Sequence, residues 1–242
     1  MFKVKNPKCK HLGADMDSNE LKQLVMLKIA SKPPEEEIAT GYVLNNLTHE
    51  NDVYRITFGW DVFTAYACDN EWNAFRLKLA AFLDKLSSAE RQAEEDKVQS
   101  EDGHWKWFNF SVMLKSDEYK WFFFRVNDEV QAACLIYHPK KSILSSHELF
   151  YIEFIAVAPW NRYNPVSQKK YSKVGSIFLK EIMKHCKDKL NYQSGMCLHS
   201  LPQAQGFYEH KLKMIRCAQA DKDGLWYYEM NEDDFLDFVR AG

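Results

Sequence analysis

Residues 153–162 read EFIAVAPWNR, and residues 173–186 read KVGSIFLKEIMKHC. The first stretch ends an apolar run rich in β-branched and aromatic residues, which predicts a strand over 148–158 that stops at Pro159. In the second stretch apolar residues recur at spacings of three and four, which predicts a helix over 175–190. A strand that leads into a helix is therefore the unit around which the fold is built.

Further elements are predicted on both sides of this unit. They are strands at 105–114, 121–126, 130–138, 196–200, 215–220 and 225–230, and a short helix at 203–210. The four residues Val126-Asn127-Asp128-Glu129 are typical of a tight hairpin connection. From residue 121 onward the order is β-β-β-α-β-α-β-β, which indicates an α/β (α+β) fold in which helices flank a mixed, mostly antiparallel sheet.

The N-terminal part of the chain reads as an extension with helices and strands of its own. Its predicted elements are a helix from Ser18 to the Lys32-Pro33-Pro34 step, one or two strands within 53–67, an amphipathic helix from Asn70 to Leu86 and a polar linker over 87–104. We therefore divide the chain into residues 1–104, which supply this extension and part of the fold, and a core of residues 105–242. The many aromatic residues of 105–124 are expected to lie in the core.

Composition narrows the class of protein. The chain has 242 residues, of which 46% are hydrophobic and 27% charged, and no apolar stretch approaches the length of a membrane span. Lysines follow Met1 without an apolar segment behind them, so we expect a cytoplasmic protein. A net charge of -2 predicts neither a nucleic-acid partner nor a membrane partner, and six scattered cysteines without a C-x-x-C pair predict no metal site.

Three segments carry a family resemblance. They are EFIAVAPWNR at 153–162, KVGSIFL at 173–179 and AQGFYE at 204–209. Together they resemble the acetyl-CoA motif and the A-x-x-F-Y-E segment of the GNAT superfamily of N-acetyltransferases. The resemblance spans roughly residues 119–230 and includes the order of the elements.

The resemblance implies acetyl-CoA as cosubstrate and no metal. The backbone of the predicted strand would bind the pantetheine arm, while the N-terminus of the predicted helix would receive the pyrophosphate beside Gly175, where the absence of a side chain allows close approach. The residues that the resemblance assigns to the cofactor are Ile155, Ala156, Val157, Arg162, Lys170, Lys173, Val174, Gly175, Ser176 and Phe207. The alternative for Gly175 is a glycine that only begins a helix.

The transfer chemistry needs a base for the amine and an acid for the leaving thiolate. Tyr208 matches the acid of the superfamily, and Glu153 matches a position where some members carry a carboxylate that acts as base. His199 and Glu148 are alternative bases. The alternative for Tyr208 is a packing tyrosine whose hydroxyl binds a backbone group.

One segment departs from the pattern of the superfamily. Arg162 stands thirteen positions before Gly175, eight more than the usual five, and Lys170 occupies the usual position instead. Lys173 replaces the middle glycine of the motif. We expect these cations to add phosphate contacts while some backbone donors are lost.

The sequence thus predicts direct transfer of acetyl from acetyl-CoA to a primary amine, with residues 1–104 on the acceptor side. The acceptor is a small molecule or the lysine or N-terminus of a protein, and its identity and the oligomeric state stay open. One alternative is a module that keeps the fold without catalysis and senses CoA or binds a protein. A second is an enzyme that uses another acyl-CoA.

Overall fold

The computed structural model describes residues 35–241, and the helix expected from Ser18 lies outside them. The chain divides after Pro33 into two units, and the described residues belong to the second. No helix between residues 35 and 241 is both long and apolar enough to cross a bilayer.

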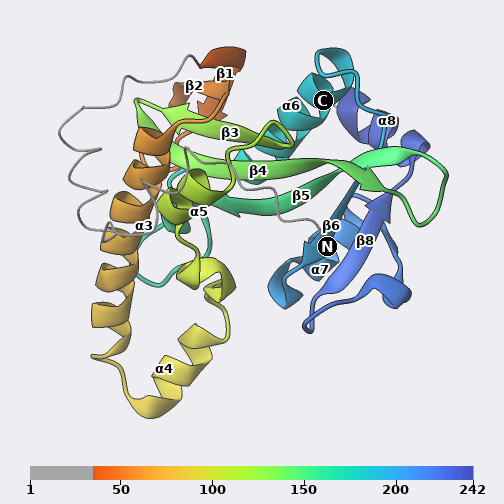
Figure 1. Ribbon diagram of the computed structural model, residues 1–242. Coiled ribbons are helices and arrows are strands. Elements are labelled where there is room, and N and C mark those ends of the chain that lie inside the picture. Colours follow the sequence, from red (N-terminus) through yellow and green to blue (C-terminus); the bar gives the residue numbers. More distant parts are fainter. Residues whose placement is uncertain (1–34, 242) are drawn as a thin grey trace, which may run out of the picture. The chain divides into compact units, whose positions relative to one another are not determined.

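An eight-stranded sheet runs through this unit in the order β1-β2-β3-β4-β5-β6-β8-β7 (Figure 1). The strands are β1 (Glu36–Leu44), β2 (Asn51–Phe58), β3 (Tyr119–Val126), β4 (Glu129–Lys141), β5 (Glu148–Val157), β6 (Met196–Ser200), β7 (Ile215–Arg216) and β8 (Trp226–Met230). Every neighbouring pair is antiparallel except β5 and β6, which are parallel. The predicted mixed, mostly antiparallel sheet flanked by helices is confirmed.

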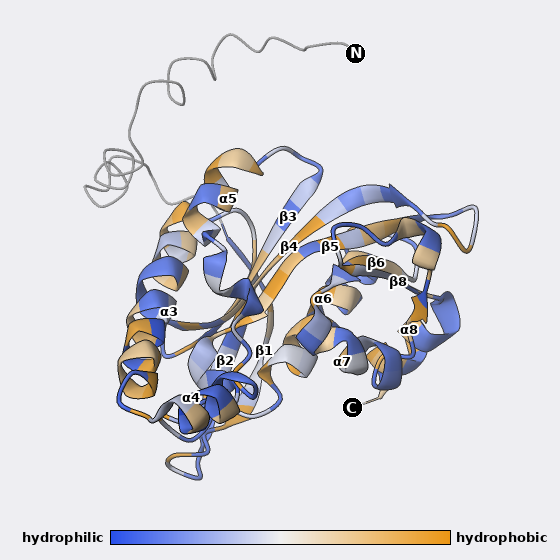
Figure 2. Ribbon diagram, turned by 90° about the horizontal axis from the view of Figure 1, so that it is seen from below, coloured by the Kyte–Doolittle hydropathy of each residue, from blue (hydrophilic) through white to orange (hydrophobic). Residues whose placement is uncertain are grey.

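Helices cover both faces of the sheet. They are α3 (Val62–Leu83), α4 (Ser88–Glu95), α5 (Trp107–Met113), α6 (Val174–Asp188), α7 (Gln205–His210) and α8 (Glu232–Arg240), with 3₁₀ turns η1 (Glu101–His104), η2 (Pro159–Asn161), η3 (Pro202–Ala204) and η4 (Ala218–Ala220). One apolar core joins the sheet to α6, α7 and α8, and a second, rich in tryptophan, joins it to α3 and α5. Figure 2 shows the central strands between α3 with α5 on one side and α6 on the other. The aromatic residues of 105–124 mostly lie in the second core, as expected.

The predicted elements around the central unit are largely confirmed. The hairpin between β3 and β4 turns at Asn127 and Asp128, whose φ angles of 49° and 63° are those of a tight two-residue turn. The strand at 148–158, the helix at 175–190 and the short helix at 203–210 correspond to β5, α6 and α7.

One predicted strand is wrong and one predicted stretch is a strand only in part, and in both cases an aspartate explains the difference. Most of the strand predicted at 105–114 is instead α5, because the Asp69 carboxylate accepts the backbone N–H groups of Trp107 and Phe108 at 2.9 and 3.0 Å. Only the first part of 53–67 is a strand, since Asp61 caps α3 there. A carboxylate that accepts the free N–H groups of a first turn stabilises the helix against its strand-like composition.

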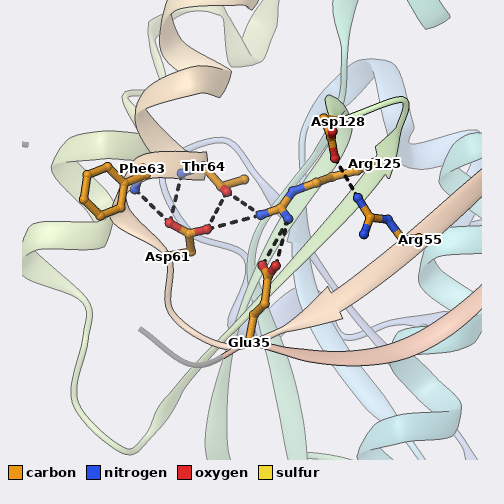
Figure 3. A network of polar contacts seen from close by, with 7 residues as sticks. All are labelled: Glu35, Arg55, Asp61, Phe63, Thr64, Arg125 and Asp128. Atoms are coloured by element: carbon orange, nitrogen blue, oxygen red, sulfur yellow. Dashed lines mark hydrogen bonds and ion pairs between the residues drawn. The ribbon is translucent and has the colours of Figure 1, made fainter. Parts of the chain in front are cut away.

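A buried ionic network ties the start of α3 to β3 (Figure 3). The guanidinium of Arg125 contacts the carboxylates of Asp61 and Glu35 at 3.2 and 3.0 Å and also donates to the Thr64 hydroxyl. The Asp61 side chain is only 1% exposed. A charge at that depth depends on its partner, because water cannot replace the lost contact.

We expect Arg125→Met to lower the free energy of unfolding by about 3 kcal/mol, because it takes the Arg125 guanidinium away from the buried Asp61 carboxylate. Arg55→Gln is the matched control, since the Arg55 and Asp128 side chains are 50% and 85% exposed and such a pair contributes at most about 1 kcal/mol. Urea denaturation measures both variants. Equal losses in the two variants would show that the buried network contributes no more than a surface pair.

Candidate active site

A pocket of about 340 Å³ lies where β5 ends and α6 begins. Its walls come from β5, from η2 and the loop after it, from the first turns of α6, from η3 and α7, and from the segment between α4 and η1. The residues predicted to bind the cofactor or the leaving group that line it are Ile155, Ala156, Val157, Arg162, Lys173, Val174, Gly175, Ser176, Phe207 and Tyr208. The fold therefore brings together segments that are more than 50 residues apart in the sequence.

The edge of β5 is open at this pocket. β5 pairs with β6 only from Phe150 to Ile152, whereas its pairing with β4 continues to Val157. Figure 1 shows β6 and β8 running at a steep angle to β5. Glu153 is the extra residue of a bulge, since Ile152 and Phe154 oppose consecutive residues of β4. Beyond this bulge, backbone groups on the β6 side of β5 are left without a strand partner and can bind an extended ligand.

The N-terminus of α6 is the second backbone feature of the pocket. No side chain caps the helix, so the N–H groups of its first turn remain available to a ligand. Such N–H groups and the helix dipole favour an anion. The helix approaches β5 closely, because a Cβ atom at Gly175 would lie 3.2 Å from Val157 Cγ2. Gly175 therefore has a packing role as well as a position at the helix start.

Lys173 stands just before α6 with a φ angle of 61°, in the left-handed region. Glycine adopts this conformation without strain, which is the physical reason for a glycine at this position of the motif. The loop keeps the backbone shape with a lysine and gains a cation at the pocket. Lys169, which lies outside the sequence motifs, also lines the pocket.

The extended loop between Arg162 and Lys173 is held by the turn between β1 and β2. The backbone N–H and the side-chain amide of Asn46 donate to the carbonyls of Lys170 and Lys169 at 2.8 and 2.9 Å. The Tyr171 hydroxyl donates to Asp52 at 2.8 Å. The N-terminal hairpin thus fixes the inserted residues, a contact across more than 100 positions that no local sequence pattern indicates.

Two cations predicted to contact phosphate are engaged elsewhere. The Arg162 guanidinium makes two 2.6 Å hydrogen bonds to the carboxylate of Asp102 and donates from Nε to the Val157 carbonyl at 2.8 Å. Arg162 therefore braces the pocket wall with most of its donors. Lys170 pairs with Glu129 and does not line the pocket.

Tyr208 lies on α7 with its side chain at the pocket and is 8% exposed. Its hydroxyl has no hydrogen-bond partner among residues 35–241, unlike that of neighbouring Tyr228, which donates to Glu209 at 2.7 Å. Burial raises the pKa of Tyr208 well above its usual range, so the hydroxyl stays protonated at neutral pH. A protonated hydroxyl without a partner can donate to a ligand.

The carboxylates and the histidine proposed as bases lie outside the pocket lining. Burial raises the pKa of Glu153 against the opposing effect of Lys140, His199 and Lys222. Both ring nitrogens of His199 are engaged, Nδ1 with the Tyr151 hydroxyl at 2.8 Å and Nε2 with the Ala220 carbonyl at 2.9 Å. Because a carbonyl only accepts, Nε2 carries the proton and Nδ1 accepts from Tyr151. Glu148 is exposed at the opposite end of β5.

No family model and no curated protein sequence matches the chain. Solved structures similar to it include the N-acetyltransferase PseH of Campylobacter jejuni in complex with acetyl coenzyme A, with a TM-score of 0.37, 13% identity and coverage of 62% of this chain and 95% of that one. PaiA N-acetyltransferase from Thermoplasma acidophilum in complex with coenzyme A has a TM-score of 0.43 at 13% identity, with 73% and 98% covered. An uncharacterized protein from Bacillus halodurans has a TM-score of 0.46 at 10% identity, with 84% and 96% covered. With every one of these TM-scores below 0.5, the roles of residues in this chain rest on its own geometry.

Proposed function

We propose that the protein is an N-acetyltransferase that moves acetyl from acetyl-CoA to a primary amine. The observation that carries this proposal is the meeting of an open β5 edge with the uncapped N-terminus of α6 in one pocket. The first feature suits the amides of a pantetheine arm, and the second suits a pyrophosphate. Lys169 and Lys173 at the same pocket add positive charge.

The residues at the pocket supply the acid that the reaction needs. As the amine nitrogen forms a bond to the thioester carbonyl carbon, it must lose a proton, and the sulfur must gain one as the carbon–sulfur bond breaks. We assign the donated proton to Tyr208, whose hydroxyl has no partner among the described residues. Glu153, on the bulge of β5 and outside the pocket lining, is our proposed acceptor of the amine proton through a bridging water, because its burial makes the carboxylate more basic.

The proposal places the acceptor on the side of the N-terminal extension, residues 1–104. Asp102 and Gln99 of this segment line the pocket, which supports a role of the extension in shaping it. Cytoplasmic location and the absence of nucleic-acid and membrane partners remain expectations from composition.

The test is release of free thiol from acetyl-CoA while a panel of polyamines, aminoglycosides and lysine peptides is added. Transfer to any primary amine supports the enzyme. Tight binding of acetyl-CoA without transfer to any member of the panel supports the alternative of a CoA-sensing module. A parallel series with longer acyl-CoA molecules separates the acetyltransferase from an enzyme with a different acyl donor.

The pH dependence of kcat/KM tests the role of Glu153. A base must be ionised, so kcat/KM falls as pH drops through the pKa of the base, which gives the acid limb of the pH profile. Because burial raises the pKa of Glu153, this limb should lie above the ordinary glutamate pKa of 4.5. We expect Glu153→Gln to remove this limb and to lower kcat/KM by about 100-fold. An unchanged acid limb in the variant would assign the base to another group.

The raised pKa of Glu153 also predicts how stability depends on pH. Activity should rise with pH in this range, whereas the contribution of Glu153 to stability should fall. A carboxyl whose pKa is raised by folding favours the folded state below the unfolded pKa and loses that contribution as pH rises through the folded pKa. Relative to Glu153→Gln, the wild type should therefore become less stable as pH rises through the folded pKa. Thermal melts from acid to neutral pH measure this difference, and parallel melting curves would contradict it.

A further inference from the structure

A second cavity, of about 370 Å³, lies on the other side of Arg162 from the candidate active site. Its walls come from α3, from the end of α4 and the segment that follows, and from the loop at residues 159–164. Gln99 and Arg162 line both cavities, so the two share a wall. Nothing in the proposed transfer chemistry uses this second space.

Arg76 is the cation at this cavity with donors to spare. The Arg162 guanidinium is matched by Asp102, and the Glu95 carboxylate by Arg91 at 2.7 Å. Arg76 reaches only Asp102 Oδ2, at 3.6 Å, and makes no hydrogen bond within residues 35–241. Its guanidinium presents five N–H groups, and burial lowers its pKa, so an anion beside it would offset the lost hydration.

Apolar groups form much of the remaining wall of the cavity, and the polar residues Glu95, Gln99, Ser100, Arg162 and Asn164 also line it. Leu79 and Leu83 of α3 face this space together with Val98, Pro159 and the ring of Tyr163. A site with apolar and aromatic wall segments and a guanidinium with free donors, that of Arg76, suits a flat ring that carries a phosphate. Arg76 and Arg162 both approach the same oxygen of Asp102, at 3.6 and 2.6 Å, so the Arg76 guanidinium lies next to the wall of the first pocket.

We propose that the second cavity holds the phosphorylated nucleoside end of CoA, with Arg76 bound to the 3′-phosphate. This inference rests on the proposed function. In CoA the pyrophosphate is attached to a ribose that carries both the adenine and the 3′-phosphate. A pyrophosphate at the N-terminus of α6 would therefore place the nucleoside near the shared wall, within reach of the cavity behind Arg162. Recognition of the cosubstrate would then depend on α3 and on the segment after α4.

The test compares the affinities of two ligands for three proteins by isothermal titration calorimetry. CoA and dephospho-CoA, which lacks the 3′-phosphate, are each titrated into the wild type, Arg76→Met and Lys78→Met. We expect the wild type to bind CoA about 10- to 100-fold more tightly than dephospho-CoA, the usual effect of a charge-assisted hydrogen bond. Arg76→Met should bind CoA as weakly as dephospho-CoA, with dephospho-CoA affinity unchanged. Lys78 is exposed on the same helix and outside the cavity, so its variant should behave as wild type.

The outcomes separate this inference from the function on which it rests. Equal affinity of the wild type for the two ligands overturns the nucleoside site but leaves CoA binding intact, whereas no binding of either ligand contradicts the proposed function itself. Equal loss of both ligands in Arg76→Met would show a structural role for Arg76 and overturn the inference. The two hydrogen bonds from Arg162 to Asp102 do not involve Arg76, so Arg76→Met should leave the shared wall in place. Arg76→Lys keeps the positive charge and should retain part of the preference for CoA over dephospho-CoA.

Discussion

Gly175→Glu is expected to weaken acetyl-CoA binding by at least about 100-fold. A new Cβ would lie 3.2 Å from Val157 Cγ2, and the new carboxylate would stand beside the N–H groups proposed to receive the pyrophosphate. Two like charges about 4 Å apart near a protein surface repel by about 4 kcal/mol, which is enough for a loss of this size. The variant should still fold, because a carboxylate in the first turn of a helix interacts favourably with the helix dipole.

Three further variants separate charge from bulk in this experiment. Gly175→Ala adds only the Cβ atom, so a small loss of affinity is expected, and Val157→Ala in the same chain should restore it by removing Cγ2. Lys115→Gln changes the net charge by the same amount at an exposed position outside the pocket and should leave binding unchanged. Wild-type affinity in Gly175→Glu, measured by isothermal titration, would remove the N-terminus of α6 from the proposed site.

Tyr208→Phe is expected to lower kcat by about 100- to 10,000-fold with little change in the KM for acetyl-CoA, as loss of a general acid does. The hydroxyl has no partner among the described residues, so its removal breaks no contact that holds this part of the fold. The ring, which contributes the packing, is kept. Steady-state kinetics with the best amine of the panel provides the measurement.

Tyr228→Phe is the matched control for this variant. Its ring centre lies 6.3 Å from that of Tyr208, and its hydroxyl donates to Glu209 at 2.7 Å. Removal of that hydroxyl should lower stability by about 1 to 3 kcal/mol and leave kcat near the wild-type value. Equal kcat values for Tyr208→Phe and the wild type would identify Tyr208 as a packing residue.

The centre of the fold could be predicted because its signals are local. β5 and α6 follow from the apolar run at 148–158 and the three-and-four spacing after Gly175, and the turn at Asn127 and Asp128 follows from residue types that tolerate a left-handed backbone. The sequence also predicted most of the pocket lining, since those residues lie on two adjacent segments and on α7. Such short-range patterns survive folding when the tertiary contacts agree with them.

The remaining features depend on contacts between distant positions. α5 replaces a predicted strand because Asp69, nearly 40 residues earlier, caps it. Arg162 faces the predicted pocket, but Asp102, placed in a linker by the sequence, takes up its donors. Lys170 is drawn to Glu129 in the same way. Pairings of this kind are set by three-dimensional proximity, which spacing along a single sequence does not reveal.

Isothermal titration of the wild-type protein with acetyl-CoA tests the central claim most directly. The open edge of β5 and the free N-terminus of α6 predict one site per chain, with a dissociation constant between about 1 µM and about 1 mM, the usual range of enzyme KM values. Absence of binding heat together with an unchanged melting temperature at millimolar acetyl-CoA would contradict the assignment of this pocket to CoA.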